Sequence, residues 1–141
     1  MAKRFTDSNK WQDDWFSDLD TSNKLAWLYI LDNCDQAGIW KKNIKLLNFS
    51  TGCSFVEDDL LKTLQDRIYP LVEDKNKWFI PKFLVFQYGP DYLNSNNKVV
   101  ILVIKKLIEL KLVKQFNNKY TLSIPYPSSI DSLKDKEQVK E

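Results

Sequence analysis

Two short helices joined by a tight turn, within residues 38–89, constrain the fold of this chain more than any other feature of its sequence. Residues 44–49 are mostly apolar and follow Asn43, a residue type that often caps the start of a helix. The pattern then breaks at residues 50–52, where Gly52 can adopt the positive φ that a tight turn requires. A second helix is therefore expected directly after this turn.

The second helix is predicted over residues 56–67 from the spacing of its apolar side chains. These recur on one face of a 3.6-residue period: Val56, Leu60, Leu61, Leu64 and Ile68. Ser54 and Glu57 match a capping box, which marks the start of a helix. Acidic residues in the first turn and Arg67 in the last turn suit the two ends of the helix dipole.

Short strands are expected on both sides of the two helices. Ile39 and Trp40 predict a strand before them. After them, residues 71–72 and the β-forming run 78–86 enclose a polar turn, which predicts a hairpin. Because Pro81 has no N–H, this run is expected to be an edge strand or to carry a bulge. The result is an α+β arrangement in the order of a winged helix-turn-helix.

Two helical segments precede this unit. The aromatic residues among positions 1–20 lie at helical spacing, which predicts a short N-terminal helix that straps over the core. A partner-binding aromatic patch is the alternative. Residues 21–34 show the clearest helical pattern, with Asp20, Thr21 or Ser22 as its cap.

A second helix-and-hairpin unit is expected toward the C-terminus, after a loop at residues 87–97. Residues 98–111 predict a helix, although their β-branched beginning also suits a strand. The following residues predict a hairpin that turns at Asn117-Asn118, since asparagine tolerates positive φ. Residues 1–124 are thus expected to form one domain, and residues 125–141 a flexible tail or linker.

The composition argues against an enzyme. The chain has no histidine and three glycines, which excludes histidine-dependent catalysis, most zinc sites and glycine-rich phosphate loops. Cys34 and Cys53 are isolated, so they are expected to be reduced thiols in a cytoplasmic protein without metal or cofactor. The longest apolar run, residues 99–104, is too short to span a bilayer, and the N-terminus lacks the pattern of a signal peptide.

Charge is distributed unevenly along the chain, although its formal net charge is only +2. Residues 93–124 carry six lysines and one acid, whereas residues 56–67 carry two bases and four acids. An acidic helix suits the major groove of DNA poorly, because phosphate contacts supply most non-specific affinity. Either its acids face away and Lys62, Gln65 and Arg67 reach DNA, or the basic surface lies elsewhere, which we favour. The remaining interpretation is a solvated face without a ligand.

The candidate DNA-binding residues are therefore all basic: Lys41, Lys42, Lys45, Lys62, Arg67, Lys75, Lys77, Lys98, Lys105, Lys106, Lys111, Lys114 and Lys119. Three aromatic residues near expected turns, Trp40, Trp78 and Tyr88, are candidates for stacking on unpaired bases. Aromatic residues at these positions more often belong to the core, and we favour that interpretation.

Three segments of the sequence are similar to a known family: RFTDSNKW, LAWLYILDNCDQAGIW and KWFIPKFLVFQYG. Together they resemble the N-terminal winged-helix domain of phage replisome-organiser proteins, which are related to DnaD-type replication initiators. The resemblance extends over residues 4–112. It implies an origin-binding protein that helps to recruit the helicase loader, with no catalytic residue.

The sequence therefore supports two functional hypotheses. The first is a non-enzymatic protein that binds double-stranded DNA in phage-type replication initiation. The second is a protein-interaction winged helix, which acts as an adaptor or as an inhibitor of a host protein; the acidic segment 56–67 motivates it. A replication or host protein is then the partner, no membrane is involved, and a homo-oligomer is left open.

Overall fold

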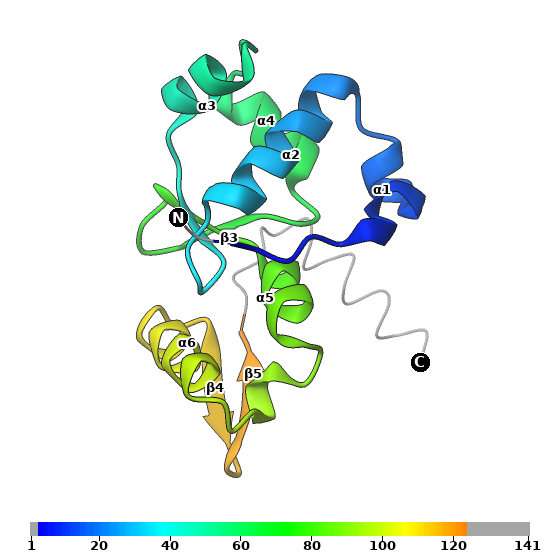
Figure 1. Ribbon diagram of the computed structural model, residues 1–141. Helices are drawn as coiled ribbons and strands as arrows, with labels where there is room; N and C mark the ends of the chain where they lie inside the picture. The colour runs from blue at the N-terminus through cyan, green and yellow to red at the C-terminus, as the bar shows by residue number, and fades with distance from the viewer. Residues whose placement is uncertain (1–2, 124–141) are drawn as a thin grey trace, which may run out of the picture.

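The computed structural model describes residues 3–123, which form an α+β fold containing two small antiparallel sheets (Figure 1). The first sheet has the strand order β1-β3-β2, formed by Ile39–Lys41, Lys77–Phe79 and Tyr69–Pro70. The second is a hairpin of β4, Val113–Phe116, and β5, Lys119–Leu122. The strand expected at Ile39 and Trp40 is therefore confirmed.

Three helices accompany the first sheet, and local capping explains where two of them begin. They are α2, Thr21–Asn33; α3, Ile44–Thr51; and α4, Glu57–Leu64. The Asp20 carboxylate accepts a hydrogen bond from the backbone N–H of Asn23 at 2.8 Å, and the Asn43 side chain accepts one from Leu46 at 3.0 Å. Gly52 ends α3 with a φ of 74°, so the predicted helices and turn are confirmed.

The predicted capping box at the start of α4 is wrong. Val56, not Ser54, occupies the N-cap, and no side chain caps the helix there. The Asn48 side chain holds the backbone of Phe55 through hydrogen bonds of 2.7 Å to its N–H and 3.0 Å to its carbonyl oxygen. Because Val56 continues this extended backbone, the helix begins two residues later than a Ser54 cap would place it. The helix ends at Leu64, so Arg67 lies beyond its last turn.

The strand expected beyond Pro81 is also wrong. After β3 the chain forms α5, Pro81–Tyr88, and then a 3-10 helix, η2, Tyr92–Asn94, within the expected loop. Proline is well accommodated in the first turn of a helix, where its missing N–H has no partner to lose. Phe83 and Leu84 are both buried in the core, and this burial outweighs the β preference of the segment.

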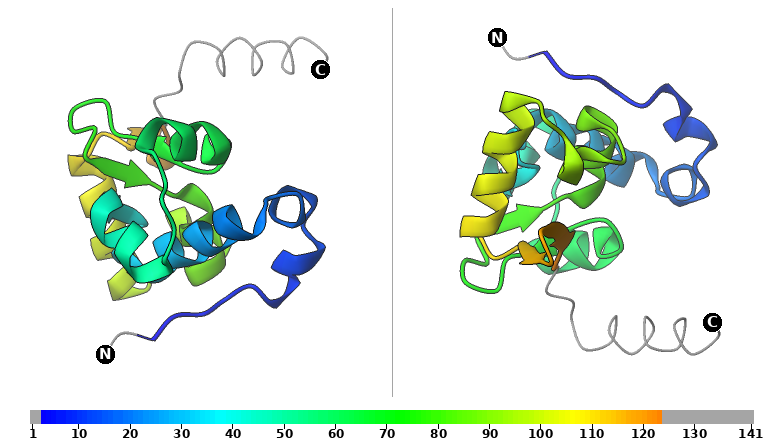
Figure 2. Two further views of the ribbon diagram at one scale, coloured as in Figure 1. Left: turned by 90° about the horizontal axis from the view of Figure 1, so that it is seen from above. Right: turned by 90° about the horizontal axis from the view of Figure 1, so that it is seen from below.

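The expected N-terminal strap is present as two short helices, η1, Ser8–Gln12, and α1, Asp14–Ser17. Figure 2 shows this segment running beside α2 at the edge of the molecule. Phe16 is 1% exposed, and the rings of Trp15 and Trp27 meet edge to face with centroids 5.0 Å apart. The aromatic side chains thus serve mainly to attach the strap, although Trp11 remains exposed.

The C-terminal unit is built as the sequence predicts. Helix α6, Lys98–Glu109, begins at Asn97, whose side chain accepts hydrogen bonds from the N–H groups of Val99 and Val100. The β-branched start is therefore helical. Asn117 and Asn118 have φ values of 50° and 63°, which confirms the tight turn with positive φ between β4 and β5.

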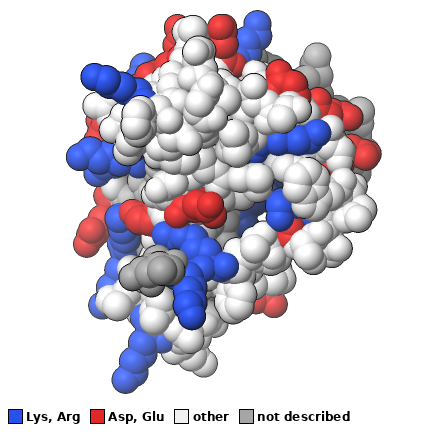
Figure 3. Space-filling model, turned by 45° about the horizontal axis from the view of Figure 1, so that its top comes forward, with Lys and Arg blue, Asp and Glu red and all other residues white. Residues whose placement is uncertain are grey.

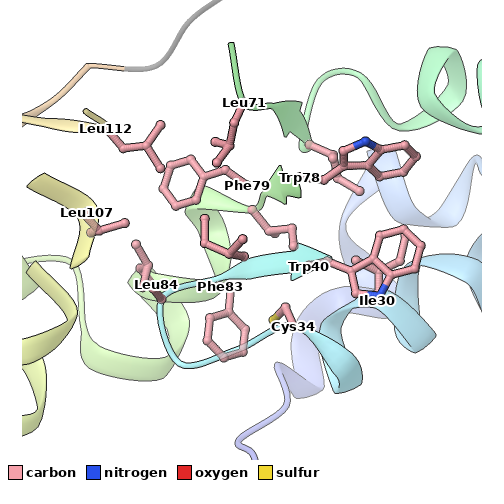
Figure 4. Packing of buried hydrophobic residues seen from close by; sticks show 14 of the residues in the cluster. Ile30, Cys34, Trp40, Leu71, Trp78, Phe79, Phe83, Leu84, Leu107 and Leu112 are labelled. Atoms are coloured by element: carbon pink, nitrogen blue, oxygen red, sulfur yellow. The ribbon is translucent and has the colours of Figure 1, made fainter. Parts of the chain in front are cut away.

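One hydrophobic core joins the two sheets (Figure 4). The Trp40 and Trp78 rings pack edge to face on one side, with centroids 5.3 Å apart. On the other side Leu107 and Leu112 bring the C-terminal unit against Phe79 and Leu84 (Figure 4). Residues from both units are therefore held at fixed positions relative to each other. The tail predicted at residues 125–141 lies outside the described residues.

Candidate nucleic-acid interface

The hairpin of the C-terminal unit has one buried face and one basic face. Val113 is buried and its strand partner Leu122 packs against the core. Side chains alternate along a strand, so Lys114, Phe116 and Lys119 all lie on the opposite, exposed face. This outward face of β4–β5 carries two positive charges and no carboxylate.

Helix α6 presents a second basic row. Its buried side chains occupy positions 100, 103, 104 and 107. At 3.6 residues per turn, Lys98, Leu102 and Lys105 lie on the face opposite to these positions. Glu109 shares that face and is the single acid of the C-terminal unit within the described residues. Among the described residues, Lys98, Lys105, Lys114 and Lys119 have no ion-pair partner.

Two lysines of the C-terminal unit, which consists of α6, β4 and β5, are paired with acids of the first unit, residues 21–79. Lys106 bonds to the carboxylate of Asp35, in the turn before β1. The Lys111 ammonium lies 2.7 Å from Glu73, in the turn between β2 and β3, and this hydrogen bond raises the pKa of Lys111. These two lysines connect the units, so they offer less charge to a ligand than the sequence suggests.

Some of the predicted basic residues of the first unit are also neutralised. Lys42 lies 2.6 Å from Glu57, and Lys77 lies 4.0 Å from Asp74. Lys41 and Lys77 are direct partners across β1 and β3. Lys45, Lys75 and Lys62 are exposed without an ion pair among the described residues, but Lys62 shares α4 with three acids.

The Arg67 side chain binds the N-terminal strap. Its guanidinium lies 3.4 Å from the carboxylate of Asp13 and 4.6 Å from the centre of the Trp15 ring. The side chain therefore fixes the strap to the segment after α4. Of the residues proposed to reach DNA from the acidic segment 56–67, Lys62 and Gln65 remain exposed, whereas Arg67 is half-buried.

The surface view agrees with this distribution. Lysine and arginine side chains gather at the lower left of Figure 3, over the C-terminal unit; acidic side chains lie directly above them and along the upper right margin. A groove of about 450 Å³ lies where residues 71–77 of the first unit meet residues 110–112 of the C-terminal unit. Lys77, Lys111, Glu73 and Asp74 all line it, so opposite charges alternate where the units meet. The structure thus places four of the predicted lysines on exposed faces of the C-terminal unit and pairs Lys77 and Lys111 with acids where the units meet.

The aromatic residues proposed to stack on bases are not available for that role. Trp40 is 3% exposed and Trp78 is 1% exposed, so both belong to the core. Tyr88 is half-buried and its hydroxyl donates a hydrogen bond of 2.7 Å to the carbonyl of Gln36. The structure exposes Phe116 instead, which the sequence analysis missed. The sequence does contain a signal for it: Lys114 and Phe116 are two residues apart in the predicted strand, so their side chains lie on the same face.

A second hollow lies between the N-terminal segment and helices α2 and α5, with a volume of about 570 Å³. Arg4 and Gln87 line it, and each has one buried polar side-chain atom that has no hydrogen-bond partner within residues 3–123. Exposed Phe5 and Phe86 contribute apolar surface.

Residues 3–123 contain no group of three or more metal-ligating side chains close enough to hold an ion. None of the helices in this part of the chain is long and apolar enough to cross a membrane. No protein-family model, curated protein or solved structure matches the chain.

Proposed function

We propose that residues 21–79 form a winged helix-turn-helix. Its helices and strands follow in the order α2-β1-α3-α4-β2-β3, and β1 pairs with β3 to complete a small antiparallel sheet. The turn between α3 and α4 is short and contains Gly52. This arrangement supports the fold that the sequence pattern predicts, with the β2–β3 turn as the wing.

We infer that the protein binds double-stranded DNA without catalysing a reaction. The observation that carries this proposal is a set of four exposed lysines on α6 and the β4–β5 hairpin. Within residues 3–123 none of them has an ion pair, and the unit has one acid. Exposed lysines bind phosphates by releasing counterions, and this supplies most sequence-independent affinity for DNA. Lys41, Lys45 and Lys75 extend the same function onto the first unit.

The acidic helix α4 is then not the main contact with DNA. Glu57, Asp58 and Asp59 form its first turn, and phosphates would be repelled by them. Lys42 offsets Glu57, and the pairing of Arg67 with Asp13 leaves Lys62 as the unpaired cation of segment 56–67 among the described residues. This favours the basic surface of the C-terminal unit over insertion of α4 into the major groove.

A salt titration with charge-reversal variants tests the proposal. Affinity for a blunt duplex is measured for the wild type, Lys105→Glu with Lys114→Glu, and the control Lys62→Glu. The double variant is expected to lose affinity, while the control on acidic α4 stays near wild type. If four lysines contact phosphates, the slope of log affinity against log salt is about −3 to −4. Absence of binding at low salt contradicts the proposal, and a larger loss in Lys62→Glu favours α4 instead.

The role in phage-type replication initiation is a further part of the proposal, supported by the similarity of residues 4–112 to replisome-organiser domains. Such a role requires preference for one DNA sequence over others. Competition of a phage replication-origin duplex against a shuffled duplex of equal length measures that preference. Equal affinity for both duplexes contradicts an origin-binding role while leaving DNA binding intact.

A second candidate function is supported by exposed apolar side chains on the helix-turn-helix. Phe49 is 86% exposed, Val56 61% and Leu46 49%, next to the acidic start of α4. An acidic surface with exposed apolar groups suits a basic protein partner better than DNA. Recovery of a stable protein complex that Phe49→Ala abolishes, without retention on DNA, favours this function.

A further inference from the structure

The exposed face of the β4–β5 hairpin carries an aromatic ring between two cations. Phe116 is 72% exposed and pairs directly with Lys119 across the hairpin. Lys114 precedes it by two residues on the same face, about 7 Å along the strand at the rise of a β-strand. Because the core packs against the other face, no described element supports the ring.

A single exposed phenylalanine is common on protein surfaces and by itself indicates nothing. Phe116 differs from the others because Lys114 and Lys119 both share its face and neither pairs with a described carboxylate. Phe49 is still more exposed, but it lies on the helix before acidic α4. The combination of a ring with two flanking cations matches the groups that bind a base and its phosphates.

We propose that this hairpin face binds unpaired nucleotides. Phe116 stacks on an exposed base, and Lys114 and Lys119 contact the neighbouring phosphates. A base inside a duplex is already stacked on both sides, so the ring gains its contact only where the strand is single or locally melted. This inference rests on the proposed DNA binding and narrows it. The lysines without an ion pair among the described residues bind the phosphates of single-stranded and double-stranded DNA alike, and Phe116 gives the preference for single-stranded DNA.

Substitutions of the ring test the inference on the full chain. Affinity is measured for a labelled single-stranded oligonucleotide and for the corresponding blunt duplex, using wild type, Phe116→Ala, Phe116→Trp and the control Phe49→Ala. Phe116→Ala is expected to lower single-strand affinity by roughly 5- to 100-fold, the effect of losing one stacked base, and to leave duplex affinity unchanged. Phe116→Trp retains a stacking surface and restores binding, and Phe49→Ala has no effect. Thermal melting by circular dichroism checks that each variant is folded.

The outcomes separate this inference from the function on which it rests. If Phe116→Ala leaves single-strand binding unchanged while Lys105→Glu with Lys114→Glu weakens duplex binding, the hairpin inference is wrong and the DNA-binding function stands. Equal losses on both substrates also overturn the selection of unpaired bases. If the wild type binds neither form at low salt, both proposals are wrong.

Discussion

Two glycines with nearly the same positive φ are predicted to differ sharply in their tolerance of a methyl group. Gly38 has a φ of 73° and Gly52 a φ of 74°. A Cβ atom at position 38 would lie 2.9 Å from the backbone oxygen of Ile80, whereas at position 52 nothing lies within 4 Å. Comparing Gly38→Ala with Gly52→Ala therefore separates the cost of crowding from the cost of positive φ.

The structure gives the size of each cost. Forcing alanine into positive φ costs about 1–2 kcal/mol at either position. At position 38 the Ile80 carbonyl cannot move freely, because the N–H of the same residue donates a 2.8 Å hydrogen bond to the Gly38 oxygen. Overpacking of this kind costs about 1–3 kcal/mol, and a strained hydrogen bond about 1 kcal/mol. Gly38→Ala is thus expected to lose about 3–6 kcal/mol of unfolding free energy, against about 1–2 kcal/mol for Gly52→Ala.

Urea unfolding followed by tryptophan fluorescence measures both values, since three of the five tryptophans are buried in the core. A shift of the midpoint at constant slope reports a change in stability. If the two variants lose the same free energy, the close approach of Ile80 to Gly38 carries no energetic weight and the reasoning is wrong.

Three further predictions concern buried side chains. Burial raises the pKa of Cys34 to about 12 from its ordinary 9.0, and that of Tyr92 to about 12 from 10.0. The unfolded chain loses these protons at lower pH than the folded protein does. The contribution of the two groups to the free energy of unfolding is therefore fully present below pH 9 and is lost as the pH rises toward 12. Urea midpoints measured across that range should decline less steeply with pH in Tyr92→Phe than in the wild type. The Tyr92 hydroxyl has no hydrogen-bond partner among the described residues, so Tyr92→Phe should be neutral or stabilising, whereas Tyr88→Phe should lose about 1 kcal/mol with the bond to Gln36; reversed effects contradict this assignment. Phe16→Ala should cost about 3–5 kcal/mol if the strap is part of the core, and an unchanged melting temperature contradicts that role.

Local signals predicted the helices that have their own caps. Asp20, Asn43 and Asn97 each accept hydrogen bonds from backbone N–H groups of the first turn that follows, and Asp20 and Asn43 are cap candidates from sequence. The Asn117-Asn118 turn was predicted for the same reason, since it depends on the φ preference of two adjacent residues. Where a cap competes with a contact from elsewhere, prediction failed, as at Ser54 beside the Asn48–Phe55 hydrogen bonds.

The sequence predicts which lysines belong to the candidate interface, but it does not predict which of them are paired with acids. The sequence identified the lysines of the C-terminal unit as a basic group, and Lys98, Lys105, Lys114 and Lys119 remain unpaired among the described residues. It could not show that Lys106 forms an ion pair with Asp35, because the two residues are 71 positions apart in the sequence.

The sequence by itself determined the order of most elements, several of the caps and turns that delimit them, and the concentration of lysines in residues 93–124. Only the tertiary structure decided that residues 81–88 are helical, which cations are neutralised, and which aromatic ring faces solvent. The physical reason is the distance along the sequence between the groups that interact. Caps and turns depend on groups a few residues apart, whereas burial and ion pairing depend on side chains that only the folded core brings together.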